Sequence, residues 1–370
     1  MSDNSSSTTV KLEDNFLRQK VREYARRQRQ ELRTSATDAL RFGLGKIKEE
    51  IKEIEHLSVK DVNGLVARIK RRKHATSDDM YRLSYAFLQG NENINAFADK
   101  QGAVQVLVKE LTGTDLTRRF DAAECFCNFS LGEAHVCEKI ATLAGTYLVT
   151  YMDIKEPRLK RSCLWTLANI LSTSNKATTT LLQMQLVPKL WKLYTAPADD
   201  LNVYQEDAAI CLYLIATSAA DLLSSEDRRY IAEHVHEKCA SGPASEYYMY
   251  IIFQTEILRL EQELCLRNSK NLLSFVETCL QGDFKTPTEK FKVIYAVRVF
   301  TNIVATFTCI DNAKLIKNLV ETLNRLFALQ DESLTMDLLR LVKNIMNLQQ
   351  SDKLLDHLQV HAFGSMQLYI

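Results

Sequence analysis

An asparagine recurs at the end of a similar apolar segment in four places along the chain. The four copies are Asn128, Asn169, Asn302 and Asn344, and the second follows the run LWTLA. Their spacings are 41, 133 and 42 residues, and the long gap corresponds to about three periods of 44, a repeat length typical of a helical solenoid. A polar residue held at one phase of stacked helices would form a row on one face. That geometry suits the backbone of an extended peptide.

Seven long apolar helices are expected to carry this repeat. Ser77-Asp78-Asp79 has the pattern of a helix N-cap followed by acidic first-turn residues. Pro157 and Pro287 fit the first turn of a helix, where a missing N–H costs nothing. The copies near Leu214 and Gln254 lack the asparagine. The expected ranges are 79–89, 118–131, 157–171, 204–217, 245–262, 288–307 and 333–348.

Composition excludes several classes of protein. The chain has few glycines and prolines for its 370 residues and 46% hydrophobic residues, which favours an all-α fold with a continuous core. The nine cysteines contain no CxxC pair, so we expect buried free thiols and no metal site. We see no signal peptide, no apolar run long enough to span a bilayer and no catalytic set. The expectation is a soluble, intracellular and non-enzymatic protein without a cofactor or a small-molecule substrate.

Charge is distributed unevenly. Residues 1–75 contain 18 Lys+Arg and 11 Asp+Glu, whereas the whole chain has a net charge of +1. A basic head on an acidic body suggests self-association or transfer of the head to a partner. We predict a disordered segment at 1–10, a basic charged helical segment at 11–75, repeats over 76–350, and a C-terminal cap or tail at 351–370.

The repeats resemble an armadillo array. The segments QGAVQVLV and LWTLANI are similar to the second and third helices of armadillo units, and the pair Trp165 and Asn169 resembles the cargo-binding repeats of importin-α. The sequence ARRQRQELR in the head resembles an importin-β-binding segment. A basic head before few repeats is closest to the divergent family called transmembrane and coiled-coil domain-containing protein six. This resemblance implies an armadillo-type right-handed α-solenoid preceded by a long basic N-terminal helix.

The resemblance also implies a function. It predicts an adaptor for nuclear protein import that binds extended cargo peptides in a concave groove and a carrier such as importin-β through its head. The corresponding groove positions are the four asparagines and the residues four positions before them. The predicted peptide-binding residues are Glu124, Asn128, Trp165, Asn169, Arg298, Asn302, Arg340 and Asn344, and the predicted carrier-binding residues are Arg26, Arg27, Arg29 and Arg33. The glutamate would attract a cation, and the two groove arginines would attract acidic side chains.

Other interpretations remain open for the same residues. The asparagines could hydrogen-bond between neighbouring repeats and order the stack, and Trp165 could be a core residue. The head could bind its own groove instead of a carrier, whereas its interspersed acidic residues argue against nucleic acid. The cluster Lys70 to Lys73 could be a localisation signal or a solvated helix end. The alternative function is an armadillo scaffold for a dedicated protein partner, followed by a peripheral membrane or RNA-associated protein.

Overall fold

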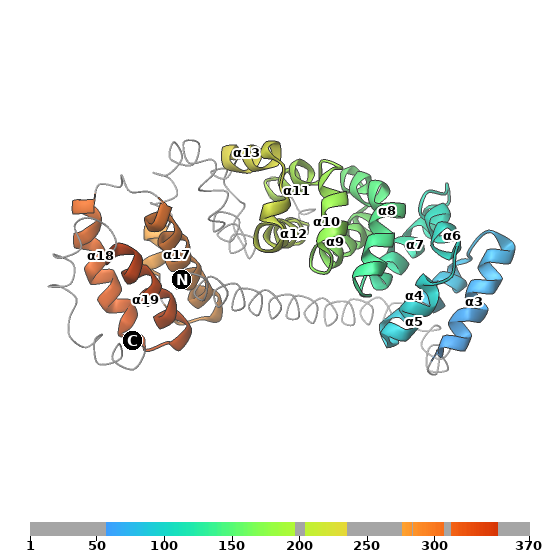
Figure 1. Ribbon diagram of the computed structural model, residues 1–370, viewed down its shortest axis with the longest axis horizontal. Helices are drawn as coiled ribbons and strands as arrows, with labels where there is room; N and C mark the ends of the chain where they lie inside the picture. The colour runs from blue at the N-terminus through green and yellow to red at the C-terminus, as the bar shows by residue number, and fades with distance from the viewer. Residues whose placement is uncertain (1–56, 197–203, 235–275, 283, 307–311, 347–370) are drawn as a thin grey trace, which may run out of the picture. The chain divides into compact units, whose positions relative to one another are not determined.

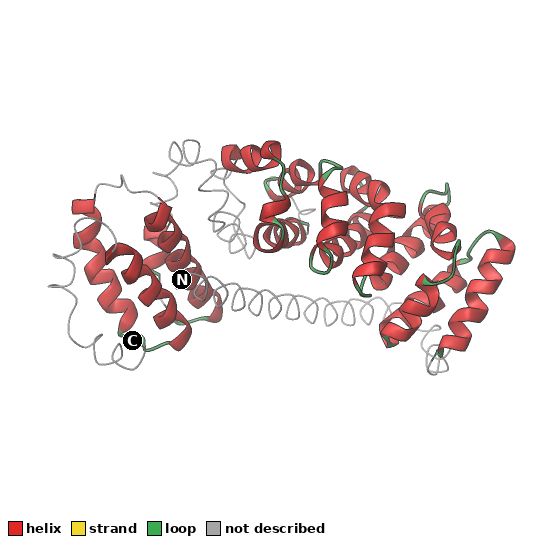
Figure 2. Cartoon of the chain, viewed as in Figure 1, coloured by secondary structure: helices red, strands yellow, loops and turns green. Residues whose placement is uncertain are grey.

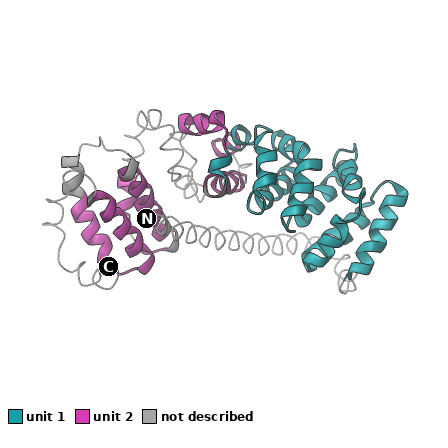
Figure 3. Cartoon of the chain, viewed as in Figure 1, with its two compact units in different colours: residues 1–190, 217–222 teal, residues 191–216, 223–370 magenta. Residues whose placement is uncertain are grey.

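The computed structural model describes residues 57–196, 204–234, 276–282, 284–306 and 312–346 (Figure 1). Within these ranges the chain is helical and contains no strand (Figure 2), so the predicted all-α class is confirmed. The chain divides into two compact units (Figure 3): residues 1–190 with 217–222, and residues 191–216 with 223–370. Residues 11–56 of the predicted basic segment, the helix expected at 245–262 and the tail at 351–370 fall outside the described residues.

Helices of the first unit follow a three-helix repeat that begins with a short helix and ends with a long one. Residues 91–129 contain one complete repeat, and the next repeat joins its first two helices into one. This order, with about 42 residues per repeat, is the armadillo-type arrangement. The helices are α3 (Val59–Arg72), α4 (Ser77–Gln89), α5 (Asn91–Ala98), α6 (Ala103–Leu111), α7 (Leu116–Phe129), α8 (Ala134–Thr150), η1 (Tyr151–Asp153), α9 (Pro157–Leu171), α10 (Asn175–Leu182) and α11 (Leu186–Tyr194).

The second unit contains five of the helices with stated bounds, and one of them, α12, ends in the first unit. They are α12 (Gln205–Ser218), α13 (Ser225–His234), α17 (Pro287–Thr306), α18 (Asn312–Phe327) and α19 (Glu332–Met346), with the short η2 (Ala220–Leu222) returning to the first unit. The long helices predicted from the sequence are thus confirmed to within two residues at each end wherever the chain is described. Pro157 stands in the first turn of α9, as predicted. The N-cap of α4 is Thr76 and not Ser77, because the Thr76 hydroxyl accepts the Asp79 N–H.

Long third helices pack directly on one another within each unit. In the first unit α4 packs on α7 and α7 packs on α9, and in the second unit α17 packs on α19 (Figure 1). Phe87, Phe97 and Phe129 join three elements of the first unit with ring centroids 5.1–5.2 Å apart. Such clusters of buried aromatic rings contribute area burial and favourable edge contacts. The stacking places equivalent positions of successive third helices next to each other.

The packed array begins earlier than the sequence suggested. Helix α3 buries Val62, Leu65, Val66 and Ile69 and contacts α4, α5 and α6. The predicted boundary between residues 75 and 76 therefore falls inside a packed unit, and the charged appearance of this segment comes from its outer face. The basic residues Lys70 to Arg72 lie in the last turn of α3, where they complement the helix dipole.

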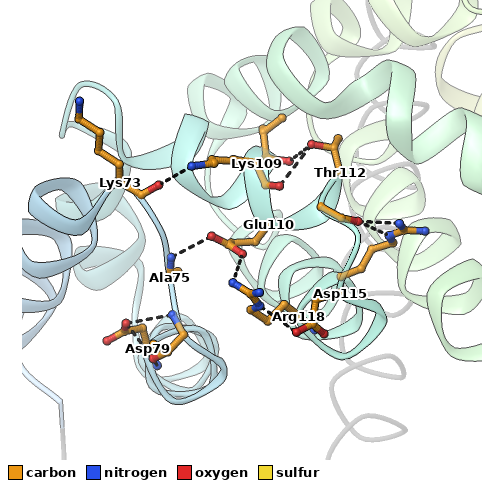
Figure 4. Close-up of polar contacts among 12 residues, drawn as sticks. Lys73, Ala75, Asp79, Lys109, Glu110, Thr112, Asp115 and Arg118 are labelled. Atoms are coloured by element: carbon orange, nitrogen blue, oxygen red, sulfur yellow. Dashed lines mark hydrogen bonds and ion pairs between the residues drawn. The ribbon is translucent and has the colours of Figure 1, made fainter.

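Two buried carboxylates fix the start of α4 (Figure 4). Glu110 on α6 accepts the Ala75 N–H at 3.1 Å and pairs with Arg118 of α7 at 3.4 Å. Asp79 is 1% exposed and pairs with Arg68 of α3. Burial opposes its ionisation, but hydrogen bonds from Thr76 and the charge of Arg68 lower the pKa of Asp79 overall. Since each carboxylate has partners on a neighbouring segment, α4 is held in one register against its neighbours.

Candidate functional site

The recurring asparagines connect consecutive third helices. Asn128 donates from Nδ2 to the Ser84 carbonyl at 3.2 Å and to the Ser84 hydroxyl at 2.7 Å. Asn169, only 4% exposed, donates from Nδ2 to the Cys127 carbonyl at 3.2 Å and to the Ser130 hydroxyl at 2.8 Å. In both cases the acceptors belong to the preceding repeat. The amide group therefore links one repeat to the next.

The same bond recurs in the second unit. Asn344 on α19 donates to the Thr301 carbonyl on α17 at 3.2 Å. Where the previous repeat also carries an asparagine, the acceptor carbonyl lies one residue before it, since Cys127 precedes Asn128 and Thr301 precedes Asn302. These bonds show that Asn128, Asn169 and Asn344 have the inter-repeat role that the sequence left open. Peptide binding by these residues stays a prediction, and for Asn128 and Asn169 the two Nδ2 donors are already used within the array.

Register identifies two residues that the sequence analysis missed. Because Asn128 bonds to Ser84, the position equivalent to the asparagine in α4 is Tyr85, and the position four residues earlier is Tyr81. Tyr81 is 37% exposed and Tyr85 is half-buried. The sequence did contain a signal for these two residues. Tyr81 and Tyr85 have the same four-residue spacing as Glu124 and Asn128 and lie one period earlier in the chain.

Side chains four positions before the asparagine form the N-terminal third-helix face, which we define by Tyr81, Glu124 and Trp165. These residues occupy equivalent positions on α4, α7 and α9, which pack in that order. The Glu124 side chain is 51% exposed and Trp165 is half-buried. Trp165 is therefore neither a fully buried core residue nor a fully exposed one, and the three side chains together present aromatic and carboxylate chemistry.

Arg158 covers part of this face. Its Nη2 lies 3.8 Å from Oε2 of Glu124, and its guanidinium lies 5.4 Å from the ring centroid of Phe120. Asp121, whose carboxylate interacts with the charge of Arg158, is half-buried. Burial raises the pKa of this carboxyl, although a hydrogen bond from Ser77 partly offsets the shift. The glutamate predicted to attract a ligand cation is thus already paired with a cation from the next third helix.

The C-terminal third-helix face, defined by Arg298 and Arg340, has a different chemistry. Arg298 Nε lies 2.7 Å from Oδ2 of Asp337, and Arg340 Nη1 lies 3.7 Å from Oδ1 of the same carboxylate. Asp337 is buried, whereas the Arg340 side chain is 56% exposed. Asn302 and Asn344 are half-buried nearby in sequence on α17 and α19. Both predicted groove arginines therefore also serve an internal carboxylate.

Several predicted features are not tested by this geometry. The carrier-binding residues Arg26, Arg27, Arg29 and Arg33 lie outside the described residues. Within the described ranges, no group of three or more His, Cys, Asp or Glu residues could hold a metal ion. None of the described helices is both long and apolar enough to cross a membrane. The described cysteines are free thiols, and burial raises the pKa of Cys125 and Cys163. We therefore find no candidate nucleophile among these buried thiols.

Comparison with known proteins concerns the fold. No protein-family model matches the chain. One engineered protein of known crystal structure is similar over 83% of this chain and 73% of its own length, with 21% identity and a TM-score of 0.62. A second engineered protein matches 65% of this chain and 98% of its own, with 20% identity and a TM-score of 0.50. A designed armadillo repeat protein covers 77% of this chain and 99% of its own at 16% identity, with a TM-score of 0.44.

Identities this low speak only for the fold, and the helical-repeat solenoid rests on the three-helix units described above. The armadillo-type architecture is thus established by the repeat itself. The closer resemblance to importin-α, and to the divergent transmembrane and coiled-coil domain-containing protein six family, stays a prediction.

Proposed function

We propose that this protein is a scaffold that binds an extended polypeptide along its N-terminal third-helix face, and that it acts as an importin-α-like adaptor in nuclear protein import. The observation that carries the proposal is the row of Tyr81, Glu124 and Trp165 at one register position of three successive helices. Packed helices are about 8–10 Å apart, and an extended peptide advances about 3.3 Å per residue. Each repeat would therefore meet two or three peptide residues.

The asparagines contribute to this surface by fixing its spacing. Their amides bond the preceding third helix, so the aromatic and charged side chains four residues earlier are held in line. Ligand affinity then comes mainly from those side chains: Trp165 and Tyr81 offer ring faces to a cationic or apolar side chain, a contact of about 0.5–2 kcal/mol. Peptide backbone recognition by the asparagines would require exchange of the inter-repeat bonds.

The adaptor part of the proposal rests on the head. Its arginines would bind an acidic carrier such as importin-β, and the protein would operate in the cytoplasm and nucleus. One observation favours the alternative of a scaffold for a dedicated partner. Because the Nδ2 donors of Asn128 and Asn169 are engaged by the array, recognition would depend on particular ligand side chains more than on backbone, which suits one partner better than many cargoes.

Peptide binding is tested with Trp165→Ala and Tyr81→Ala in the full-length chain. Fluorescence anisotropy with a labelled peptide of alternating lysine and serine should show a loss of affinity of about 1–2 kcal/mol, the cost of a cation–π contact. Tyr147→Ala is the matched control, since Tyr147 is 40% exposed on α8 and lies off the third-helix face. Equal affinity in the wild type and in both face variants would reject the proposed binding surface.

Carrier binding is tested separately with purified importin-β. A full-length variant with glutamine at all four predicted carrier-binding arginines should lose capture of importin-β in a pull-down. Capture that survives the substitutions, or no capture by the wild type, would leave the dedicated-partner scaffold as the better account. Peptide affinity of the same variant is measured in parallel, and an unchanged value would separate carrier binding from peptide binding.

A further inference from the structure

Asp337 holds two arginines where one would neutralise it. Its carboxylate is 5% exposed and receives Arg298 from α17 at 2.7 Å, within hydrogen-bond distance. Arg340, one turn further along α19, approaches the other carboxylate oxygen only to 3.7 Å. The first contact is a charge-assisted hydrogen bond, and the second is an ion pair without one. The pair Arg298 and Asp337 therefore already balances its charge.

The second arginine leaves a positive surplus at the surface. The Arg340 side chain is 56% exposed, and the next basic residue on the same helix, Lys343, is exposed as well. A guanidinium presents its N–H donors in a planar fork that fits a carboxylate or a phosphoryl group in a bidentate manner. Because its contact with Asp337 is long, Arg340 can orient this fork outward at little cost.

The first unit shows that a partly buried acid at this register position does not require two arginines. Asp121 stands seven residues before Asn128, as Asp337 stands seven before Asn344. The positions that hold Arg298 and Arg340 in the second unit are occupied by Tyr81 and Glu124 in the first. A half-buried carboxylate is thus tolerated there with a hydrogen bond from Ser77 and the more distant charge of Arg158. Neutralising an acid is not a sufficient reason for Arg340.

We infer that Arg340, positioned with Arg298 around Asp337, receives an anionic side chain of a polypeptide ligand, a carboxylate or a phosphoryl group. This inference rests on the proposed function and adds the chemistry of the ligand at the C-terminal third-helix face. Asp337 acts as an internal competitor that holds the two guanidinium groups in place. The ligand anion binds the side of the cluster that Asp337 does not cover.

The experiment uses the full-length chain at about 0.15 M ionic strength, where long-range attraction is screened. Three labelled peptides are compared by fluorescence anisotropy: alternating glutamate and serine, alternating glutamine and serine, and alternating phosphoserine and glycine. The glutamate peptide should bind more tightly than the glutamine peptide, and Arg340→Gln should weaken it about fivefold or more, as expected for a lost charge-assisted contact. The phosphoserine peptide shows whether a phosphoryl group replaces the carboxylate.

Two further variants separate a binding role from a structural one. Arg71→Gln removes the same charge from an exposed position of α3 and should leave affinity unchanged. Asp337→Asn removes the internal competitor and should tighten binding of the glutamate peptide, which a purely structural role would not do. If Asp337→Asn unfolds, as judged by circular dichroism, Arg340→Gln decides the matter, because the exposed Arg340 is dispensable for packing.

Equal weakening by Arg340→Gln and Arg71→Gln would overturn the inference, and so would equal affinity for the glutamate and glutamine peptides. These outcomes differ from a failure of the proposed function. If Trp165→Ala leaves the lysine peptide unaffected while Arg340→Gln still weakens the glutamate peptide, the extended binding surface is rejected and the anion site stands. The reverse pattern rejects the anion site alone.

Discussion

The two third-helix faces share one backbone device and differ in the chemistry beside it. In both units an asparagine amide bonds a carbonyl of the preceding third helix, at the same register. Four residues earlier, the first unit carries Tyr81, Glu124 and Trp165, whereas the second carries Arg298 and Arg340. The difference teaches that the asparagine specifies stacking in both units, whereas the residue four positions before it varies between them and carries the ligand chemistry in the proposed function.

The largest effect should come from removing the close partner of a buried acid. Arg298→Ala leaves Asp337 buried with only the 3.7 Å approach of Arg340, and should destabilise the protein by about 2–4 kcal/mol. Chemical denaturation followed by circular dichroism measures the loss. In an Asp337→Asn background the same substitution should cost much less. A cost below about 1 kcal/mol in the wild-type background would contradict the close ion pair of Arg298 and Asp337, because a loss that small is typical of a solvent-exposed ion pair.

A second comparison concerns the asparagines themselves. Asn169→Ala removes two hydrogen bonds at a site that is 4% exposed, and leaves the Cys127 carbonyl and the Ser130 hydroxyl without that donor. It should cost about 1–2 kcal/mol, against about 0.5–1 kcal/mol for Asn344→Ala, which is half-buried with one such bond. If Asn169→Ala instead keeps full stability and loses peptide affinity, its main role is ligand binding.

The sequence was sufficient to predict the repeat and much less sufficient to predict the site. Helix ranges followed from apolar periodicity and proline positions, which are local properties of the chain. The partners of Asn128 and Asn169 could not be predicted, because half of them are backbone carbonyls, which every residue has. Tyr81 was not predicted, because its repeat carries Tyr85 where the later repeats carry asparagine. A tyrosine in a helix is, besides, commonly a core residue.

Helix α3 and Asp337 illustrate two further limits. The apolar residues of α3 follow the spacing of an amphipathic helix, yet its many charges led to its assignment to the head. Asp337 looked like any acidic residue on a helix. Its importance depends on Arg298 from another repeat, and sequence spacing within one helix does not reveal a contact between residues 39 positions apart.

The two register-equivalent acids should respond oppositely to substitution. The pKa of Asp121 is raised above its ordinary value of 3.8, so its ionised form is less favourable in the folded protein than in the unfolded chain. Asp121→Asn should therefore stabilise the protein at neutral pH, by about 0.5–1 kcal/mol. Asp337→Asn should destabilise it, because that carboxylate has a close cation.

The sign for Asp121 also fixes a pH dependence. Its destabilisation is fully present above the folded pKa, falls as pH drops through that value, and is absent below 3.8, where both states are protonated. The advantage of Asp121→Asn over the wild type should shrink accordingly in denaturation experiments from pH 7 to acid. An advantage that grows on acidification would mean that Asp121 is stabilised in its ionised form, contrary to its burial.

Arg158→Ala should have the smallest effect on stability of these substitutions, and it should change ligand affinity only at the N-terminal third-helix face. Both side chains of its ion pair with Glu124 are exposed, and the ring that it contacts, Phe120, is half-buried, so the loss should be about 0.5 kcal/mol or less. Removing this cation takes a positive charge away from the neighbourhood of Glu124, and affinity for the lysine peptide should rise about two- to threefold, with Arg158→Lys close to the wild type. A fall in that affinity would show that Arg158 itself contacts the peptide. A rise would show that Arg158 partly neutralises the negative charge of Glu124 in the first unit. Asp337 has the corresponding effect on the positive charge of Arg298 and Arg340 in the second unit.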